Sequence, residues 1–403
     1  MTACDTKSIV KWLADGARSA PRPDLVLAEL CDRLVQAGIP LWRVAVFVRT
    51  LHPEIIGRRF VWQLGAGVTT TEGQFNLLEE ERFRNSPFTA VVTTGRPIRR
   101  RLWEDNVEEF PLYRELRAEG ATDYLAAPLI FTDGAVHVAT WSTQQPGGFT
   151  DAQLAGIETI VDPLARVAEI RALQRTAANL LDTYVGHNAG ERILAGRIRR
   201  GHTETIRSVI WLSDMRGFTS LADRLPPQTL VDLLNRYFDC QVPAILEHGG
   251  EVLKFMGDGL LAIFPLREGN ADMGEACARA LTAARQAQAN IDAMDTSNDI
   301  GRAHGISFGL ALHLGEVLYG NIVSGNRLDF TCIGPAVNLA ARLEKVAAGL
   351  GRAIVLSADF AQFASVDLEP LGEFAVAGFS APQKAFGLRD GAAAASARGV
   401  SRD

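Results

Sequence analysis

The sequence has few cysteines, and their positions suggest neither a disulfide framework nor a zinc site. An odd number of scattered cysteines is typical of a protein in a reducing compartment. The five cysteines, which we expect to be packing residues, are Cys4, Cys31, Cys240, Cys277 and Cys332. The seven histidines contain no H-x-x-x-H or Cys/His grouping. We therefore predict structural or surface roles for His304 and His313, the two nearest the motifs described below.

Long apolar runs and an excess of positive charge are also missing. No apolar segment reaches the roughly 18 to 20 residues that a membrane-spanning helix needs, and the opening MTACDTKSIVKW lacks the apolar region of a signal peptide. The 41 basic and 47 acidic residues give a formal charge of −6, so no overall basic field attracts nucleic acid or an anionic membrane. We expect a cytoplasmic protein that binds neither, in which a small anionic ligand needs a local site.

What the sequence does contain is ordinary globular composition in two differently patterned halves. Its 403 residues are 47% hydrophobic and 22% charged, which favours two domains joined by a connector. In residues 1–150, the segment 24–38 places Leu27, Leu30 and Leu34 on one helical face, and several β-rich runs follow. This half is predicted to be an α+β domain.

Residues 151–202 are predicted to be a helical linker, with two apolar stripes in different registers. The first stripe is Leu154, Ile157, Val161, Leu164 and Ala168, and the second is Ile170, Leu173, Ala177, Leu180 and Tyr184. Such a stripe can pair with its copy in a coiled coil, or it can pack on its own domain, and both readings are open. Pro163 either starts a new helix or kinks a continuous one.

Residues 203–390 alternate between strand and helix patterns, which predicts one sheet with helices on its face. A single helix is expected over PPQTLVDLLNRYFDCQVPAILEHG, followed by the hairpin EVLKFMGDGLLAIF. The Ala-rich tail, 391–403, is expected to be disordered.

Two aspartates in this half suggest phosphate chemistry. Asp214 ends an apolar strand in LSDMRGFT, just before a helix start at which the backbone N–H groups of Phe218 and Thr219 can face an anion. Taken alone, this motif is better read as a capping aspartate. Asp258 lies at the tip of the hairpin KFMGDG, whose turn explains the glycines but not Lys254. If the two aspartates are neighbours, they can hold two cations for displacement at phosphorus.

The motifs SDMRGFT, KFMGDG and VNLAAR, in that order and spacing, resemble the class III nucleotide cyclases over about Thr203 to Arg389. The resemblance implies a ferredoxin-like α/β catalytic domain that uses two Mg²⁺ or Mn²⁺ ions per active site. It also implies a role for each motif residue: metal binding by Asp214 and Asp258, purine reading by Lys254 and Thr331, ribose positioning by Asn338, and transition-state stabilisation by Arg342. Asn338 and Arg342 are four residues apart, so they share one face of a helix.

The purine-reading pair favours adenine, and hence conversion of ATP to cyclic AMP and pyrophosphate. Lys254 can donate to adenine N1 and the Thr331 hydroxyl can accept from the N6 amine, whereas guanine would require an acidic partner. Thr331 also resembles the subgroup that includes bicarbonate-responsive cyclases. Arg327 is a candidate ligand for the β- or γ-phosphate or a surface cation. Pro335 departs from the Asp usual in the family, but proline suits a first helical turn.

The N-terminal half resembles a GAF-type sensor over YLAAPLIFTDGAVHVATWSTQQPGGFTDAQLAGIETI. We therefore expect regulation of an adenylate cyclase by a small-molecule effector or bicarbonate. The alternatives are a guanylate cyclase and a catalytically silent nucleotide-binding module. Because Lys254 and Asp258 are up to roughly 13 Å apart along a strand, and the family forms its sites between two catalytic domains, we expect a head-to-tail homodimer that binds ATP.

Overall fold

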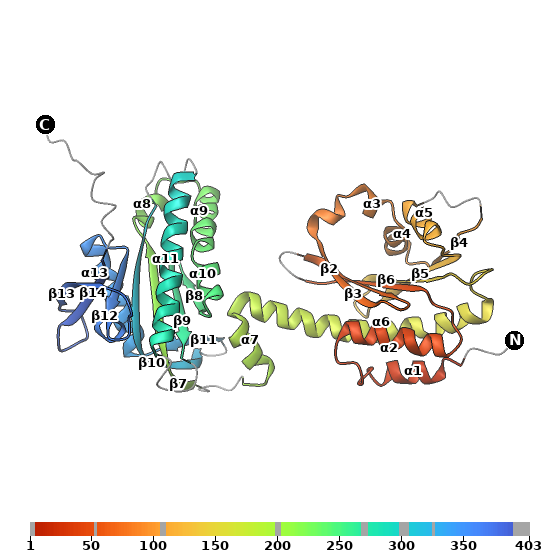
Figure 1. The fold of residues 1–403 in the computed structure, drawn as a ribbon, viewed down its shortest axis with the longest axis horizontal. Helices are drawn as coiled ribbons and strands as arrows, with labels where there is room; N and C mark the ends of the chain where they lie inside the picture. The colour runs from red at the N-terminus through yellow and green to blue at the C-terminus, as the bar shows by residue number, and fades with distance from the viewer. Residues whose placement is uncertain are drawn as a thin grey trace. The chain divides into compact units, whose positions relative to one another are not determined.

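The computed structural model describes residues 5–51, 55–104, 110–197, 203–266, 273–297, 306–324 and 327–389. The chain divides into two compact units, Met1–Leu180 and Leu181–Asp403 (Figure 1). The first unit thus includes most of the segment predicted as a linker. The predicted tail, 391–403, lies outside the described residues.

The first unit is built on a six-stranded antiparallel sheet with the strand order β3-β2-β1-β6-β5-β4. The strands are β1 (Arg43–Arg49), β2 (Ile55–Gln63), β3 (Gly67–Gln74), β4 (Ile98–Arg101), β5 (Asp123–Ile130) and β6 (Val136–Thr143). Their side chains alternate between the two faces of the sheet, and each face carries its own buried cluster. The α+β prediction for this half is confirmed.

Helices cover both faces of this sheet (Figure 1). On one face lie α1 (Lys7–Ala14), α2 (Pro23–Gln36) and the first half of α6 (Asp151–Val185). The predicted apolar face of α2 is buried, with Leu27, Leu30 and Leu34 at most 3% exposed. The other face carries four short elements: η1 (Phe75–Leu78), α3 (Glu81–Arg84), α4 (Pro87–Thr94) and α5 (Pro111–Ala118).

Helix α6 is continuous through Pro163, which settles the question of a new helix start at that residue. The first apolar stripe packs on its own unit, since Ile157 and Leu164 are at most 4% exposed. The second stripe is exposed: Leu173 is 63% and Tyr184 is 81% accessible. The change in register therefore marks the point at which the helix stops packing on its own domain. Gly186, with φ at 85°, separates α6 from α7 (His187–Leu194).

The second unit contains an eight-stranded sheet with the order β13-β14-β12-β10-β7-β9-β8, and β11 pairs with β10. The strands are β7 (Thr203–Met215), β8 (Glu251–Met256), β9 (Gly259–Pro265), β10 (Phe308–Ser324), β11 (Arg327–Ile333), β12 (Ile354–Ser357), β13 (Leu368–Phe374) and β14 (Gln383–Leu388). The four strands β10-β7-β9-β8 have the order and antiparallel directions of a ferredoxin-like βαββαβ core. The predicted ferredoxin-like sheet is thus present.

The helices of the second unit cover this sheet on both faces. The core that faces α9 (Pro227–Asp239), α10 (Val242–Glu247) and α11 (Met273–Ser297) is the larger, and α13 (Pro335–Leu350) packs on the opposite face. The prediction of one helix over 226–249 is wrong. The chain breaks between α9 and α10, where Pro243 occupies the first turn of the new helix and cannot donate the backbone bond of a continuous one.

The described cysteines have the packing role that the sequence predicts. Cys31, Cys240, Cys277 and Cys332 are free and buried, as predicted for packing residues, whereas Cys4 lies outside the described residues.

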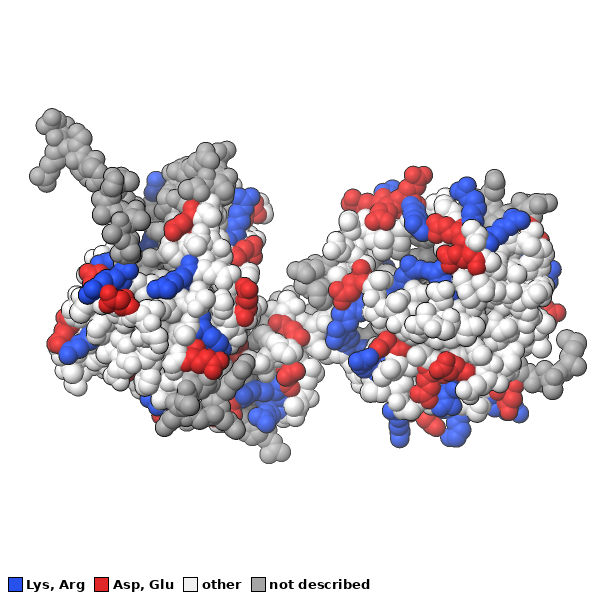
Figure 2. All heavy atoms as spheres, viewed as in Figure 1, with Lys and Arg blue, Asp and Glu red and all other residues white. Residues whose placement is uncertain are grey.

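Across the described ranges, no helix combines the length and apolarity needed to cross a membrane. On the face visible in Figure 2, the acidic and basic side chains of the described residues are interspersed over each unit.

Candidate active site

The carboxyl groups of Asp214 and Asp258 lie next to each other. Asp214 is the penultimate residue of β7 and pairs with Gly309 of β10, and Asp258 occupies the turn between β8 and β9. Gly257 supplies the φ of 68° that this turn requires. Strand β9 pairs with β7, which brings the turn back to the end of β7, and Asp258 hydrogen-bonds to Asp214.

The electrostatics of this pair fit a divalent cation. Burial raises the pKa of Asp214 to about 7, and the hydrogen bond and charge of Asp258 and the charge of Glu344 act in the same direction. Arg216 opposes them. Two carboxylates this close repel each other unless a proton or a cation lies between them. Within the described residues no third His, Cys, Asp or Glu joins the pair to form a metal-binding group.

Helix α8 (Phe218–Ala222) begins directly after β7. Gly217 precedes it with φ at 72°, a left-handed conformation that turns the chain sharply away from the strand. Phe218 is half-buried and packs against the core of the unit, while Thr219 is exposed. The first N–H groups of a helix lack partners within the helix, so those of Phe218 and Thr219 could face an anion. Because α8 follows β7, both residues lie close to the aspartate pair in the sequence and in the fold.

Arg216 and Glu344 form an ion pair beside the aspartates, and the sequence analysis missed it. Their Nη1 and Oε1 atoms are 2.8 Å apart, and the Glu344 side chain is only 8% exposed. Burial raises the pKa of Glu344, which Arg216 opposes. The signal that could have found the pair is Glu344 itself, a charge at helical spacing from the apolar Ala340, Leu343 and Ala347. The ion pair ties α13 to the end of β7.

Lys254 lies on β8 and forms an ion pair with Asp329 of β11. Thr331 is two residues further along β11, on the same face of the strand, and is 7% exposed. The two predicted purine-reading side chains are thus on neighbouring elements. Asp329 is a second residue that the sequence analysis missed. Lys254 faces solvent with 43% of its side chain exposed, which answers why a lysine occurs in an otherwise apolar hairpin strand.

Asn338 and Arg342 lie on the outer face of α13. The buried residues of this helix include Leu339, Leu343 and Ala347, whereas Asn338 is exposed and Arg342 half-buried. At about 100° per residue, Arg342 projects about 200° away from Glu344 around the helix axis. The face that contacts Arg216 and the face that carries Asn338 and Arg342 are therefore opposite.

The remaining candidates are Arg327, His304 and His313. The side chain of Arg327 and the whole of His304 lie outside the described residues. His313 is buried and its Nδ1 is 2.9 Å from the Ser357 hydroxyl. Burial lowers the pKa of His313 to about 4, which agrees with the predicted structural role.

A family comparison identifies the second unit. Residues 202–389 match the family of the adenylate and guanylate cyclase catalytic domain. This segment is a class III cyclase catalytic domain.

Relatives of the cyclase domain include adenylate cyclases. The chain is 33% identical to an adenylate cyclase of Anabaena cylindrica over 164 residues, which is 40% of this chain and 31% of that protein. An uncharacterized protein of Mycobacterium bovis is 30% identical over 370 residues, or 85% of this chain and 58% of the relative. The solved structure of the adenylyl cyclase CyaB from P. aeruginosa is 27% identical, with a TM-score of 0.42, covering 47% of this chain and 97% of that one. The chain thus spans less than two thirds of these two curated relatives.

In one copy of the cyclase domain, the aspartates are far from the predicted purine-reading residues. Asp214 is opposite Gly309 and Thr331 is opposite Gly320 on the same strand, β10. Gly320 follows Gly309 by eleven residues, which corresponds to roughly 36 Å along an extended strand. In one copy, Asp214 and Thr331 are therefore opposite residues near the two ends of β10.

We expect replacement of Gly309 by alanine to destabilise the cyclase domain. A Cβ at Gly309 would lie 1.6 Å from Nη2 of Arg216, so the guanidinium would have to swing away from Glu344. Loss of this pair should reduce the free energy of unfolding by about 1 to 3 kcal/mol, less than for a fully buried pair because Arg216 is 26% exposed. Urea unfolding measures the change. Gly349→Ala, which meets no atom within 4 Å on α13, is the matched control, and an equal effect of both substitutions would contradict the prediction.

Proposed function

We propose that the protein is an adenylate cyclase that converts ATP to 3′,5′-cyclic AMP and pyrophosphate at a site shared between two copies of the chain. The observation that carries the proposal is the juxtaposition of Asp214 and Asp258 within a segment that matches the cyclase catalytic domain. A carboxyl group with a strongly raised pKa, such as that of Asp214, is typical of functional sites.

Each predicted residue has a step to perform. In the reaction the 3′-oxygen of the ribose forms a bond to the α-phosphorus, its proton leaves, and the bond to pyrophosphate breaks. Asp214 and Asp258 would hold two Mg²⁺ or Mn²⁺ ions, which would acidify the hydroxyl and neutralise phosphate charge. Asn338 would orient the ribose, and Arg342 would stabilise the charge that builds on the transferring phosphate.

Phosphate binding would be completed at the start of α8 and by Arg327. The N–H groups of Phe218 and Thr219 would donate to phosphate oxygens. Arg327 would contact the β- or γ-phosphate through its guanidinium.

Recognition of adenine would rest on Lys254 and Thr331. Lys254 would donate to N1, and the Thr331 hydroxyl would accept from the N6 amine. The ion pair with Asp329 supports this role because it holds the ammonium group of Lys254 beside β11, the strand that carries Thr331.

The dimer is proposed from the separation of the half-sites. Because Arg342 faces away from Glu344 and Thr331 lies roughly 36 Å along β10 from the aspartate pair, one chain cannot assemble all of these residues at one substrate. A two-fold dimer that joins the aspartates of one copy to the helix face of the other would complete two identical sites.

We further propose that the N-terminal half is a GAF-like regulatory domain that acts through α6. Its six-stranded antiparallel sheet, covered by helices on both faces, supports this assignment. The exposed stripe of α6, including Leu173 and Tyr184, would contact a second copy. The effector would be a small molecule or bicarbonate.

The test is a cyclic-nucleotide assay of the purified chain with ATP and with GTP, each with Mg²⁺ and with Mn²⁺. Metal-dependent formation of cyclic AMP from ATP is expected. Preferential formation of cyclic GMP would identify a guanylate cyclase. Nucleotide binding without product under all four conditions would identify the silent module.

We expect the base preference to shift when the polarity of the purine-reading groups is reversed. The variant combines Lys254→Glu and Thr331→Cys with a third substitution, Asp329→Asn. The third substitution is needed because the carboxylate of Asp329 would repel a glutamate at position 254. The ATP:GTP ratio of kcat/KM should fall by about tenfold or more, since guanine offers a donor where adenine offers an acceptor. Lys384→Glu, which alters only an exposed pair with Glu373 on β13, is the control. An unchanged ratio with activity well above background would count against the adenine-reading roles.

A further inference from the structure

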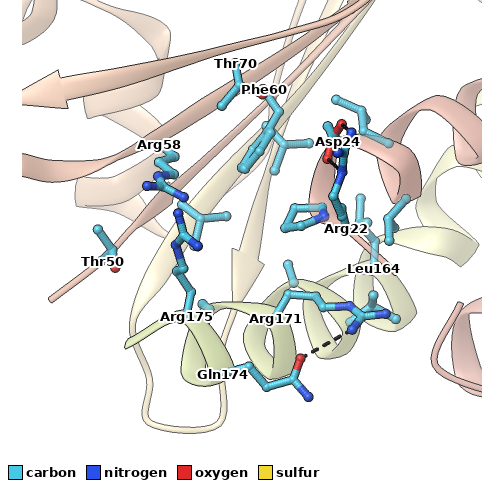
Figure 3. Close-up of a pocket in the computed structure, with 18 of the residues that line it drawn as sticks. Arg22, Asp24, Thr50, Arg58, Phe60, Thr70, Leu164, Arg171, Gln174 and Arg175 are labelled. Atoms are coloured by element: carbon cyan, nitrogen blue, oxygen red, sulfur yellow. Dashed lines mark hydrogen bonds and ion pairs between the residues drawn. The ribbon is translucent and has the colours of Figure 1, made fainter. Parts of the chain in front are cut away.

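The first unit contains a cavity of about 480 Å³ that no step of the proposed reaction uses. It lies between the sheet, the beginning of α2 and the middle of α6 (Figure 3). Its lining is mainly apolar and includes Leu27, Val46, Val48, Phe60 and Leu164. A concave, mostly apolar space of this size is typical of small-molecule sites.

The charged groups around this cavity are almost all cationic. Its charged lining residues are one acid, Asp24, and five arginines: Arg22, Arg49, Arg58, Arg171 and Arg175. The cavity therefore has an excess of positive charge around an apolar interior.

Two of these arginines have ion-pair partners in the protein. Arg22 pairs with Asp24 at 2.6 Å, and Arg58 pairs with Glu72 at 2.6 Å. Arg171 donates from Nη2 to the carbonyl of Ala20 at 3.1 Å. These contacts hold the guanidinium groups at the edge of the cavity.

The other two arginines are available to a ligand. Within the described part of the chain, the guanidinium groups of Arg49 and Arg175 make no hydrogen bond or ion pair. Figure 3 shows Arg175 extending from α6 towards Arg58 on β2, with the ring of Phe60 beside them. A carboxylate between Arg175 and Arg58 would accept hydrogen bonds from both, because guanidinium groups bind carboxylates in a bidentate manner.

Helix α6 connects this cavity to the exposed apolar stripe. Leu164, Arg171 and Arg175 line the cavity, whereas Leu173 and Tyr184, which are 63% and 81% exposed, lie on roughly the opposite side of the helix at about 100° per residue. The cavity and the stripe therefore use different faces of one helix. A second copy would pack on the stripe, which leaves the cavity for a small molecule.

We propose that this cavity binds a small organic acid, with an apolar body against Phe60 and Leu164 and a carboxylate on Arg58 and Arg175. Binding links α6 to β2 of the sheet, and so alters how the exposed apolar stripe of α6 contacts a second copy of the chain. The regulatory half of this inference rests on the proposed cyclase function, whereas the binding half does not. The chemistry of the occupant follows from the excess of arginines over acids around the cavity, from Arg175, which has no ion-pair partner among the described residues, and from the apolar lining.

Titration calorimetry of the full chain with decanoate tests the binding half. Decanoate should bind saturably at one site per chain, and decyltrimethylammonium, with the same chain length and the opposite charge, should not. Arg175→Glu should weaken decanoate binding by about tenfold or more, because an attraction becomes a repulsion. Arg117→Glu, at an exposed position on α5, is the matched control. Equal affinity of the Arg175→Glu and Arg117→Glu variants, or no saturable binding by the wild type, overturns the site.

A second substitution tests the space of the cavity independently of its charge. Ala168 lines the cavity and is half-buried on α6, so Ala168→Phe should occupy the space and abolish decanoate binding. Circular dichroism melting reports whether this variant folds. A folded Ala168→Phe chain that binds decanoate with wild-type affinity would overturn the cavity as the site.

The regulatory half is measured by assaying cyclic AMP formation with and without decanoate. Decanoate should change the rate of the wild type at concentrations that saturate the calorimetric site, and leave Arg175→Glu unaffected at the same concentrations. Saturable binding with an unchanged rate overturns the regulatory half alone. If the chain has no cyclase activity under any condition, the proposed function is wrong, and calorimetry still decides whether the cavity binds the acid.

Discussion

Replacing Asp214 or Asp258 with alanine is expected to reduce the turnover of ATP by about 10³-fold or more while leaving the fold intact. The expected loss is large because the cations held by these carboxylates carry most of the stabilisation of phosphate charge. The fold should persist because the charged form of Asp214 is unfavourable where it lies: burial and Asp258 together raise the pKa of Asp214 to about 7. Removal of either acid relieves the repulsion between the two carboxyls.

The measurement is kcat with ATP at saturating Mg²⁺ and Mn²⁺, together with the thermal unfolding midpoint of each variant. We expect a midpoint at or above that of the wild type, since a functional site is often a source of strain. Asp223→Ala, at an exposed aspartate directly after α8, is the matched control and should retain full activity. Near-normal turnover in Asp214→Ala or Asp258→Ala would refute the two-metal assignment.

Mixing two inactive variants is expected to restore activity. An Asp214→Ala chain lacks an aspartate of one half-site, and an Arg342→Ala chain lacks the arginine of the other. In a heterodimer both lesions fall in one active site, and the second site is wholly wild type. With random exchange half of the dimers are mixed and each has one intact site of two, so about a quarter of the wild-type activity should return.

The control is a mixture of Asp214→Ala with Asp258→Ala. Both lesions are then in the same half-site, so every dimer has two damaged metal pairs and activity should stay at the level of the single variants. Heterodimer formation is followed by native mass spectrometry with one chain isotopically labelled. If mixed dimers form and the Asp214→Ala with Arg342→Ala mixture remains inactive, the shared site is wrong.

The features that local patterns could predict are those that depend on neighbours in sequence. The Gly257 turn and the strand spacing around Asp258 indicated a hairpin, and the hairpin brings Asp258 to Asp214. The apolar stripes predicted the helix that α6 forms, but they left open which stripe packs on its own domain, and only the structure shows that Leu173 is exposed.

The features that the sequence did not reveal depend on packing between distant segments. Arg216 and Glu344 are 128 positions apart, and their pairing requires the sheet to place α13 over the end of β7. Lys254 and Asp329 are likewise joined only when β8 and β11 come together. Periodicity reports which face of an element is buried, but not which charge on another element lies opposite it.

The proposed division of each active site between two chains has a consequence for inheritance. In the proposed dimer each chain contributes its aspartates to one site and its Arg342 to the other, so an Asp214→Ala, Arg342→Ala double variant would inactivate both sites of any dimer that it formed with a normal chain. Each site would receive one faulty half from the damaged subunit. In the proposed dimer such an allele would be dominant-negative, whereas an allele with only one of the two substitutions would leave every mixed dimer with one working site.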